Sequence, residues 1–204
     1  MNNINYQKEL DKLIEQIGDN NSKKLLLHAC CAPCSSYCLM YLSQYFEITV
    51  LFYNPNINSE SEYVKRAEEL KRFIGEMEFK NKVDYIDFDF IPDEFYSEVK
   101  GLENCAEGGE RCFVCYELRL DRTAAYAKEN KYDYFCTTLS ISPLKNSAKI
   151  NEIGYKLAEK YNVEWLPSDF KKKNGFKTSV ELSKKYNLYR QNYCGCVFSK
   201  KSNN

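Results

Sequence analysis

The apolar run LLL at residues 25–27, which leads directly into a cluster of cysteines, constrains the fold of this chain more than any other feature. The run is short and uniformly apolar, so it lacks the alternation of a strand that has one face in water. Strands of this kind are typical of parallel sheets with both faces covered. The sequence therefore predicts a buried strand over residues 24–29, with Cys30, Cys31 and Cys34 after its carboxyl end.

The rest of the chain alternates between strand-like and helix-like segments. Further strands are expected over residues 47–53, 83–88, 132–138 and 163–166. Helices are expected over residues 5–17, 35–44, 59–78, 92–99, 112–130, 146–161 and 179–186. This alternation predicts an α/β fold with a mainly parallel sheet and helices on both faces. Because no linker interrupts it, we expect a single domain over residues 1–204, with an N-terminal helix within 1–22 and the sheet-forming body over 23–199.

Composition indicates in which compartment the cysteines work. The 204 residues are 44% hydrophobic and 28% charged, which allows a substantial core without disulfides. The first 24 residues lack the apolar core of a signal peptide, and no run approaches the ~20 apolar residues of a membrane span. We therefore expect a cytoplasmic protein with no membrane partner. In a reducing compartment, its 10 cysteines are better candidates for metal ligands or redox groups than for disulfides.

The formal net charge of zero conceals an uneven distribution. Residues 1–138 contain 16 Lys and Arg against 24 Asp and Glu, whereas residues 139–204 contain 13 against 5. The final third of the chain could thus offer a basic surface to phosphate or nucleic acid. Solvated helix faces without a ligand explain the same lysines, and charge alone does not separate the two interpretations.

Seven cysteines form three closely spaced groups, namely Cys30, Cys31 and Cys34, then Cys112 and Cys115, and finally Cys194 and Cys196. A C-x-x-C spacing places two sulfurs on one side of a turn, where both can bind one metal ion or cluster. Seven thiolates exceed the four of a tetrahedral zinc site. They favour an iron–sulfur cluster with a second metal, or a cluster beside redox thiols. A structural zinc site with free buried cysteines is the alternative.

Polar segments follow four of the predicted strands. They are Cys30 and Cys31 after the first, and residues 54–56, 137–143 and 167–169 after the others. The carboxyl ends of parallel strands share one edge of a sheet, where ligands bind near a switch in strand order. We therefore expect these segments to surround one site.

The other cysteines and the single histidine are expected to be structural, with one exception. Cys136 lies within a predicted strand and Cys38 one helical turn after Cys34, so both are expected in the core. Cys105 lies in a loop, and its role stays open. His28 ends a buried strand and is expected to be a hydrogen-bonded core group. Since the chain has neither a Walker-type loop nor a G-x-G-x-x-G segment after a strand, ATP and a bound dinucleotide are not expected.

Five ordered motifs together resemble the QueH family of epoxyqueuosine reductases. They are HACCAPC at residues 28–34, YNPNI at 53–57, GERCFVCYELRL at 109–120, TTLSISPLK at 137–145 and YCGC at 193–196. The likeness extends over residues 24–199. It implies a Rossmann-like fold of the adenine nucleotide hydrolase-like (HUP) group. It also implies a reaction that removes the epoxide oxygen of epoxyqueuosine at the wobble position of a tRNA and gives queuosine.

The resemblance further implies the cofactors. These are a [4Fe–4S] cluster and an adjacent second metal, expected to be iron, with no cobalamin and with an external electron donor. We expect the cluster on Cys30, Cys112, Cys115 and Cys196, and the second metal on Cys31, Cys34 and Cys194. In some family members an Asp stands at the position of Cys34, so the ligand type there varies. Residues 23–199 would then form the metal-binding catalytic domain, with a cysteine-bearing C-terminal segment.

Contacts with a tRNA substrate are expected at the same edge. Asp169 is a candidate proton donor or acceptor for a base edge, and Arg190 is a candidate catalytic cation beside the terminal thiols. Substrate-binding candidates are Asn54, Tyr63, Arg66, Ser140, Ser142, Lys145 and Tyr193. Lysines 171–173, 184–185 and 200–201 are candidates for contacts with tRNA phosphates.

Two other functions are compatible with parts of this pattern. One is a zinc-stabilised nucleic-acid-binding module without catalysis. The other is an ATP-using tRNA thiolation enzyme of similar fold, although residues 30–34 contain no glycine-rich nucleotide loop.

Overall fold

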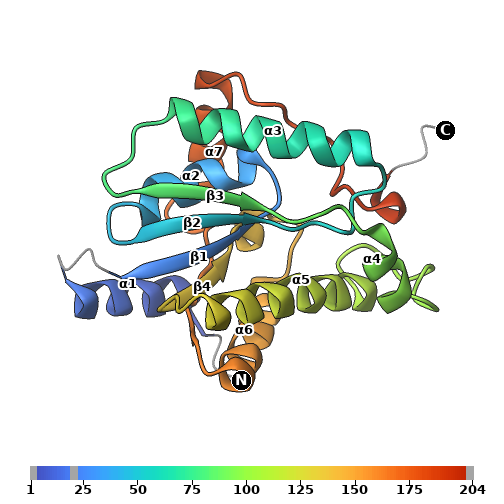
Figure 1. Cartoon of the computed structure of the whole chain (residues 1–204), viewed down its shortest axis with the longest axis horizontal. Helices are drawn as coiled ribbons and strands as arrows, with labels where there is room; N and C mark the ends of the chain where they lie inside the picture. Colours follow the sequence, from blue (N-terminus) through green and yellow to red (C-terminus); the bar gives the residue numbers. More distant parts are fainter. Residues whose placement is uncertain (1–3, 19–22, 201–204) are drawn as a thin grey trace.

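Five parallel strands form one sheet in the order β3-β2-β1-β4-β5 (Figure 1). The computed structural model describes residues 4–18 and 23–200. The strands are β1 (Lys24–Ala29), β2 (Glu47–Phe52), β3 (Val83–Asp87), β4 (Tyr134–Thr137) and β5 (Glu164–Trp165). Because β1 pairs with both β2 and β4, His28 lies beside Leu51 on one side and Thr137 on the other. The predicted parallel α/β sheet is confirmed.

Helices cover both faces of this sheet (Figure 1). One face carries α2 (Ala32–Leu42), α3 (Glu60–Glu76) and α7 (Gly175–Lys185). The opposite face carries α1 (Tyr6–Ile17), α5 (Glu110–Glu129) and α6 (Ser147–Tyr161). A short helix, α4 (Pro92–Glu98), lies beyond the carboxyl ends of the strands, and two 3-10 helices are η1 (Thr138–Ile141) and η2 (Val197–Ser199).

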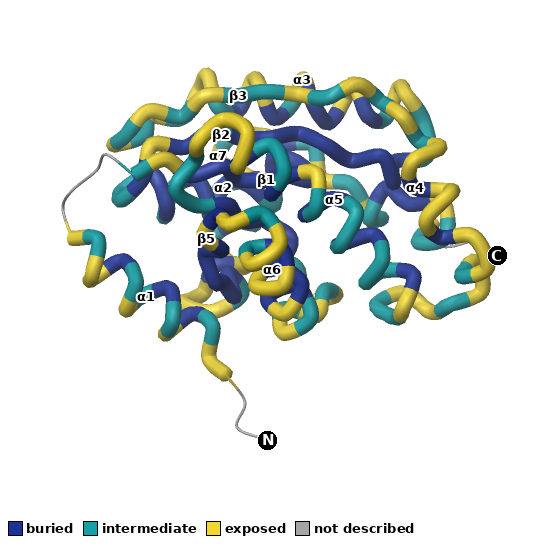
Figure 2. Tube along the Cα trace, turned by 60° about the horizontal axis from the view of Figure 1, so that its bottom comes forward, coloured by how far each residue is buried: buried dark blue, intermediate teal, exposed yellow. Residues whose placement is uncertain are grey.

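The central strand has the burial that its uniform apolar sequence predicted. Leu25, Leu26 and Leu27 are each 0% exposed. Figure 2 shows β1 and β2 as buried tubes between the more exposed helices of the two faces. This arrangement removes both faces of β1 from water, which is why the strand needs no polar alternation.

The strand order switches between β1 and β4. From β1 the chain continues outward through β2 to β3, and it then returns to the other side of β1 to form β4. Open parallel sheets bind ligands beyond the carboxyl ends of strands at such a point. Cys30 follows β1 and Thr138 follows β4, and their side chains meet there with Sγ 3.7 Å from Oγ1.

Several element boundaries differ from the predicted ones. Helix α2 begins at Ala32 rather than at residue 35, because Pro33 suits the first turn of a helix, so Cys34 is already helical. Helix α7 begins at Gly175 rather than at residue 179. Strand β4 ends at Thr137, whose hydroxyl accepts a hydrogen bond from the Leu139 amide and starts η1. Among the described residues, no helix is long and apolar enough to cross a membrane.

Candidate metal centre

Three sulfurs converge at the junction of β1 and α2. Cys30 follows the strand, Cys31 is the extended residue that precedes α2, and Cys34 lies in its first turn. Their Sγ atoms lie within 4.8 Å of one another, and the Cys30 and Cys31 sulfurs are 3.8 Å apart. Two thiolates that each bind a tetrahedral ion at ~2.3 Å are ~3.8 Å apart. This trio therefore has the spacing of ligands to one metal ion.

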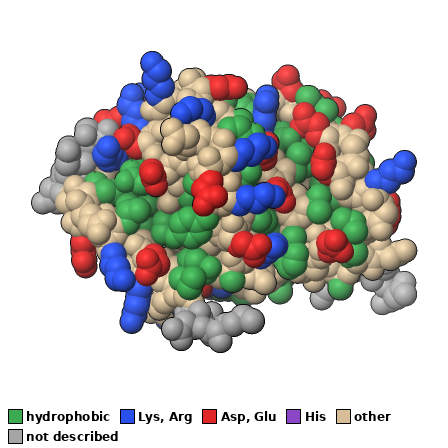
Figure 3. All heavy atoms as spheres, turned by 90° about the horizontal axis from the view of Figure 1, so that it is seen from below, with side chains coloured by type: hydrophobic (Ala, Val, Ile, Leu, Met, Phe, Trp, Pro, Cys, Tyr) green, Lys and Arg blue, Asp and Glu red, His purple; other side chains and the backbone are tan. Residues whose placement is uncertain are grey.

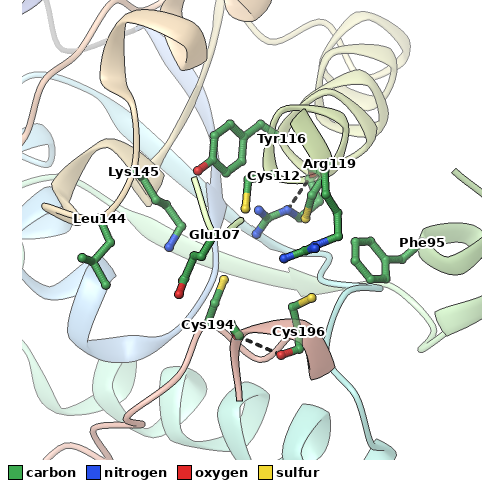
Figure 4. Close-up of a pocket in the computed structure, with 12 residues that line it drawn as sticks. Phe95, Glu107, Cys112, Tyr116, Arg119, Leu144, Lys145, Cys194 and Cys196 are labelled. Atoms are coloured by element: carbon green, nitrogen blue, oxygen red, sulfur yellow. Dashed lines mark hydrogen bonds between the residues drawn. The ribbon is translucent and has the colours of Figure 1, made fainter. Parts of the chain in front are cut away.

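The other four grouped cysteines come from two further segments. Cys112 and Cys115 lie in the first turns of α5, and Cys194 and Cys196 lie in the strap, defined here as residues 187–200. All four line one narrow cavity of about 20 Å³ (Figure 4). No three of these four sulfurs lie within 4.8 Å of one another, so the quartet is more widely spaced than the trio.

This grouping differs from the expected division of the ligands. The sequence-based division placed Cys30 with the quartet and Cys194 with the trio. In the structure, the Cys30 sulfur lies 3.8 Å from the Cys31 sulfur, and Cys194 lines the cavity of Cys112, Cys115 and Cys196. Neighbouring residues can share one ion here because the chain turns from strand to helix between them. The set of seven stays a prediction, and the geometry favours three plus four.

Buried cations surround these thiols. Arg119, on α5, is 1% exposed, and its Nη2 is buried without a hydrogen-bond partner among the described residues. Burial disfavours its charge, but the Cys115, Cys194 and Cys30 thiolates raise the pKa of Arg119. Lys145 is half-buried. Burial disfavours its charge, but the neighbouring thiolates, Cys194 first, raise the pKa of Lys145. Such cations fit an anionic thiolate-ligated centre, whose negative charge they offset.

Thiol ionisation is uneven within the trio. Hydrogen bonds from Cys31 and Cys34 lower the pKa of Cys30 well below its usual value, and they outweigh the opposing effect of burial. The Cys31 pKa is raised to about 12, chiefly because its proton is shared with Cys30. Cys30 is therefore the thiol of the trio that loses its proton most readily, and binding of a metal would release the protons of the others.

Helix α3 anchors the strap. The Arg66 guanidinium is 2% exposed, pairs with Glu62 through Nε at 2.7 Å and donates from Nη1 to the Cys194 carbonyl at 3.1 Å. In the loop before α3, the Asn58 amide donates to the Gly195 carbonyl at 2.9 Å. Tyr193 donates to the Asn58 side chain at 2.9 Å, and Arg66 lies over its ring. These contacts set the position of both strap cysteines.

Gly195→Ala should displace the strap. Gly195 has φ +106°, and an added Cβ would lie 3.0 Å from Arg66 Nη1 and 3.0 Å from Ile57 Cγ1. We expect a loss of ~1–3 kcal/mol of stability from backbone strain, and a lower iron content after anaerobic reconstitution. Gly101→Ala is the matched control, because Gly101 also has a positive φ but its Cβ would meet nothing within 4 Å. Equal iron contents in the two variants would contradict the anchoring role.

A second cavity, of about 300 Å³, adjoins the first and receives part of the predicted substrate-binding set. Arg190, Tyr193, Ser142 and Lys145 line it, together with Cys30, Cys34 and Cys194. Lys145 and Cys194 line both cavities, so the two spaces meet at these side chains. The larger cavity thus connects both thiol groups to the surface.

Other predicted site residues lie outside the lining of both cavities. Tyr63 donates to the Phe88 carbonyl at 2.7 Å, Ser140 bonds Ser168 at 3.0 Å, and Asn54 donates to the Ala29 carbonyl at 2.9 Å. Asn54 also accepts from Arg119 at 3.4 Å, which places it behind the site. Arg66 acts on the strap, as described above.

The structure places Asp169 in an ion pair with Lys171, at 2.8 Å, rather than in either cavity. Its role as proton donor stays a prediction without a geometric basis here. No residue of the segment 167–169 after β5 lines either cavity, whereas Cys30 after β1 and Ser142 after β4 line the larger one.

Several lining residues were not singled out from the sequence. Glu107, Leu144, Tyr116 and Arg119 line the narrow cavity, and Phe176 and Gln191 line the larger one. Tyr116 and Arg119 lie within the motif at 109–120, one or more helical turns after Cys112, so helical spacing could have indicated them. No sequence signal distinguished Glu107 from the other acidic residues of its loop.

The residues expected to be structural have structural contacts. His28 is fully buried and bonds Thr137 Oγ1 at 2.8 Å and the Tyr53 carbonyl at 3.0 Å, and burial lowers its pKa to about 3. Cys38 and Cys136 are each 0% exposed. The Cys105 carbonyl accepts a hydrogen bond from Arg111. His28 is therefore a neutral core group.

Many lysines of the final third of the chain are neutralised by the acidic body. Lys156 and Lys160, on α6, pair with Glu117 and Asp121 of α5, each at 2.6 Å. Figure 3 shows basic and acidic side chains intermixed on this underside of the molecule. Lys171 and Lys173 also form ion pairs, with Asp169 and Asp11. Lys201, one of the predicted phosphate contacts, lies outside the described residues.

Sequence comparisons agree with the geometry. A family model described as "Epoxyqueuosine reductase QueH" matches residues 25–202. Curated relatives with that name come from Staphylococcus epidermidis (46% identity over 96% of this chain and 84% of the relative), Streptococcus pyogenes (45%, 97% and 79%) and Thermotoga maritima (37%, 86% and 89%). The chain therefore belongs to the QueH family of epoxyqueuosine reductases.

Proposed function

We propose that this protein is an oxidoreductase that removes the epoxide oxygen of epoxyqueuosine at the wobble position of a tRNA and leaves queuosine. Family membership supports this reaction. The observation that carries the proposal is that six cysteines from three chain segments line two adjoining cavities at the switch point of the sheet, with Cys31 beside Cys30 and Cys34. Net reduction requires an electron-carrying centre, and thiolate-rich sites are suited to one.

The donor set fits two metal groups. In the proposal, Cys112, Cys115, Cys194 and Cys196 hold a [4Fe–4S] cluster, and Cys30, Cys31 and Cys34 hold an adjacent iron ion. The Nη2 atoms of Arg119 and Arg66 are buried and have no partner within residues 4–18 and 23–200, which favours an anionic group nearby. When bound, these groups supply electrons one at a time and a Lewis acid for the epoxide oxygen. The proposal requires an external electron donor, but neither cobalamin nor ATP.

The chain's own residues would bind and orient the modified nucleoside. The aromatic side chains of Tyr193 and Phe176 line the larger cavity, and RNA-binding proteins commonly stack unpaired bases on such rings. Gln191 Oε1 is buried there without a partner in the described part of the chain, so it can accept a hydrogen bond from a base edge. Lys145 brings an ammonium group to the junction of the two cavities, where the epoxide oxygen would lie.

The tRNA backbone should bind along α7. Lys184 and Lys185 are exposed on this helix, whose Phe176 and Ser179 line the larger cavity, and neither lysine forms an ion pair within the described ranges. Replacing both by Gln should weaken tRNA binding and reduce the slope of log K against log salt by about 2. Filter binding at several salt concentrations measures this. Lys156→Gln/Lys160→Gln is the matched control. An equal change in slope in this control would show that the tRNA backbone does not bind along α7.

A single-turnover assay tests the reaction. Iron-reconstituted protein is incubated without oxygen with dithionite and tRNA that carries epoxyqueuosine, and the nucleosides are then analysed by mass spectrometry. We expect the nucleoside to lose one oxygen atom, and protein stripped of iron to give no conversion. Absence of conversion by iron-replete protein would reject the proposal. A colourless sample that binds only zinc would favour a nucleic-acid-binding module instead.

A further inference from the structure

Glu107 occupies a distinctive position between the two cavities. It lines both of them, and among the described residues it is the one carboxylic acid that lines either. Figure 4 shows its side chain pointing into the narrow cavity beside Lys145 and Cys194. These are the side chains at which the two cavities meet. A carboxyl group at this junction faces the space between the trio and the quartet of thiols.

The loop that carries Glu107 is held in place by a buried cation. Arg111 is 3% exposed, and its Nη1 donates to the carbonyls of Leu102, Glu103 and Cys105. Its guanidinium also lies 4.7 Å from the ring centre of Phe198, in the strap. At the other end of the loop, the Gly108 amide donates to the Cys112 sulfur at 3.2 Å. The loop is thus fixed to α5 and faces the strap, although Glu107 itself is exposed.

Reduction of an epoxide to an alkene needs a proton source at the oxygen. Two electrons and two protons are consumed, both C–O bonds break, a C=C bond forms, and the oxygen leaves as water. The external donor of the reductase supplies the electrons. Asp169 is paired with Lys171 outside the cavities, so it does not face this oxygen. Glu107 faces the junction on one side and solvent on the other, which allows it to be protonated again after each transfer.

We propose, on the basis of the function inferred above, that Glu107 is the proton donor to the departing epoxide oxygen. The carboxyl group transfers its proton to the oxygen at the cavity junction and regains one from water at its exposed side. Lys145, from the loop after η1, and Cys194, from the strap, lie beside it in the cavity. The other charged or titratable groups that line this cavity are Cys196 of the strap and Arg111, Cys112, Cys115, Tyr116 and Arg119 of α5. The Lys145 ammonium keeps the departing oxygen and the carboxyl group together.

Glu107→Gln tests the assignment, because the amide keeps the shape of the side chain but cannot donate an acidic proton. Turnover in the assay described above should fall by about 10²–10⁴-fold. Iron per chain, the visible spectrum and tRNA affinity should equal those of the parent protein. Glu103→Gln is the matched control, since it removes the same charge from the same loop, keeps the acceptor for the Gly101 amide and lies outside both cavities. We expect its turnover to be unchanged.

Chemical rescue provides a test that a purely structural role would not pass. Formate is small enough to replace the lost carboxyl group, so Glu107→Ala should gain at least ~10-fold in turnover when formate is added, whereas Glu103→Ala should not respond. Loss of iron in Glu107→Gln would make Glu107 a metal ligand and overturn the proposal. So would full turnover of Glu107→Gln, or a Glu107→Ala variant that formate does not restore. An inactive parent protein would instead reject the proposed function.

Discussion

Cys115→Ser is expected to abolish epoxyqueuosine reduction while the fold persists. Cys115 is 6% exposed, and burial raises its pKa to about 12, so it becomes a thiolate only when a metal replaces its proton. A serine hydroxyl is a harder and far less acidic ligand, which suits iron–sulfur binding poorly. We therefore expect loss of most of the quartet's iron and at least ~10³-fold lower turnover. Iron analysis and the anaerobic assay measure the two effects.

Cys136→Ser is the matched control for this prediction. Cys136 is also a fully buried thiol, but it lies within β4 and donates to the Leu166 carbonyl at 3.3 Å, a bond that a serine hydroxyl can replace. Its iron content and turnover should be those of the parent. If Cys115→Ser retained full iron and full turnover, Cys115 would have to be removed from the set of ligands.

The second large effect is expected at Arg119. Its guanidinium is buried beside Cys115, Cys194 and Cys30, and it offsets their negative charge. Arg119→Gln leaves buried thiolates without this cation, and removal of one partner of a buried charge pair typically costs ~3–5 kcal/mol. We expect weaker retention of iron. The reduction potential of the loaded protein should also fall, because a cation stabilises the reduced, more negative state.

The expected fall in the reduction potential of Arg119→Gln follows from the free-energy scale of a one-electron couple. A difference of about 1.4 kcal/mol between the two redox states corresponds to ~59 mV, so a decrease of at least ~50 mV is expected. Potentiometric titration of the variant measures it. Arg122→Gln, three residues further along α5 and exposed to solvent, should leave the potential unchanged. Equal potentials in the Arg119 variant and the parent would show that this cation does not act on the centre.

Local patterns were sufficient to predict the fold. The run at residues 25–27 has one stable environment, the middle of a sheet covered on both faces, and the alternating strands and helices follow from it. The cores around Cys38 and Cys136 were predictable for the same reason, because both sit among apolar neighbours at strand or helix spacing. Boundaries were less certain, since the first turn of α2 depends on Pro33 and on the turn at Cys31.

Tertiary structure decided which candidate residues face the site. Tyr63 and Ser140 lie in predicted segments, but their hydroxyls bond Phe88 and Ser168 instead of lining a cavity. Several lysines of the basic final third pair with acidic residues that are distant in sequence, such as Lys173 with Asp11. Composition gives the number of charged residues but not their ion-pair partners, so the sequence overstated the basic surface.

By itself, the sequence determined a parallel α/β sheet and the seven thiols that gather beyond it. The close spacing of Cys30, Cys31 and Cys34, the gathering of the other four thiols in one cavity, and the positions of Glu107 at the cavity junction and Arg119 in the narrow cavity were decided by the tertiary structure. The physical reason is that sequence patterns report local contacts, whereas the site is built from distant segments. Periodicity and C-x-x-C spacing report contacts within one turn or strand. The strap, α5 and the β1–α2 junction are separated by many tens of residues, and only packing around the sheet brings their side chains together.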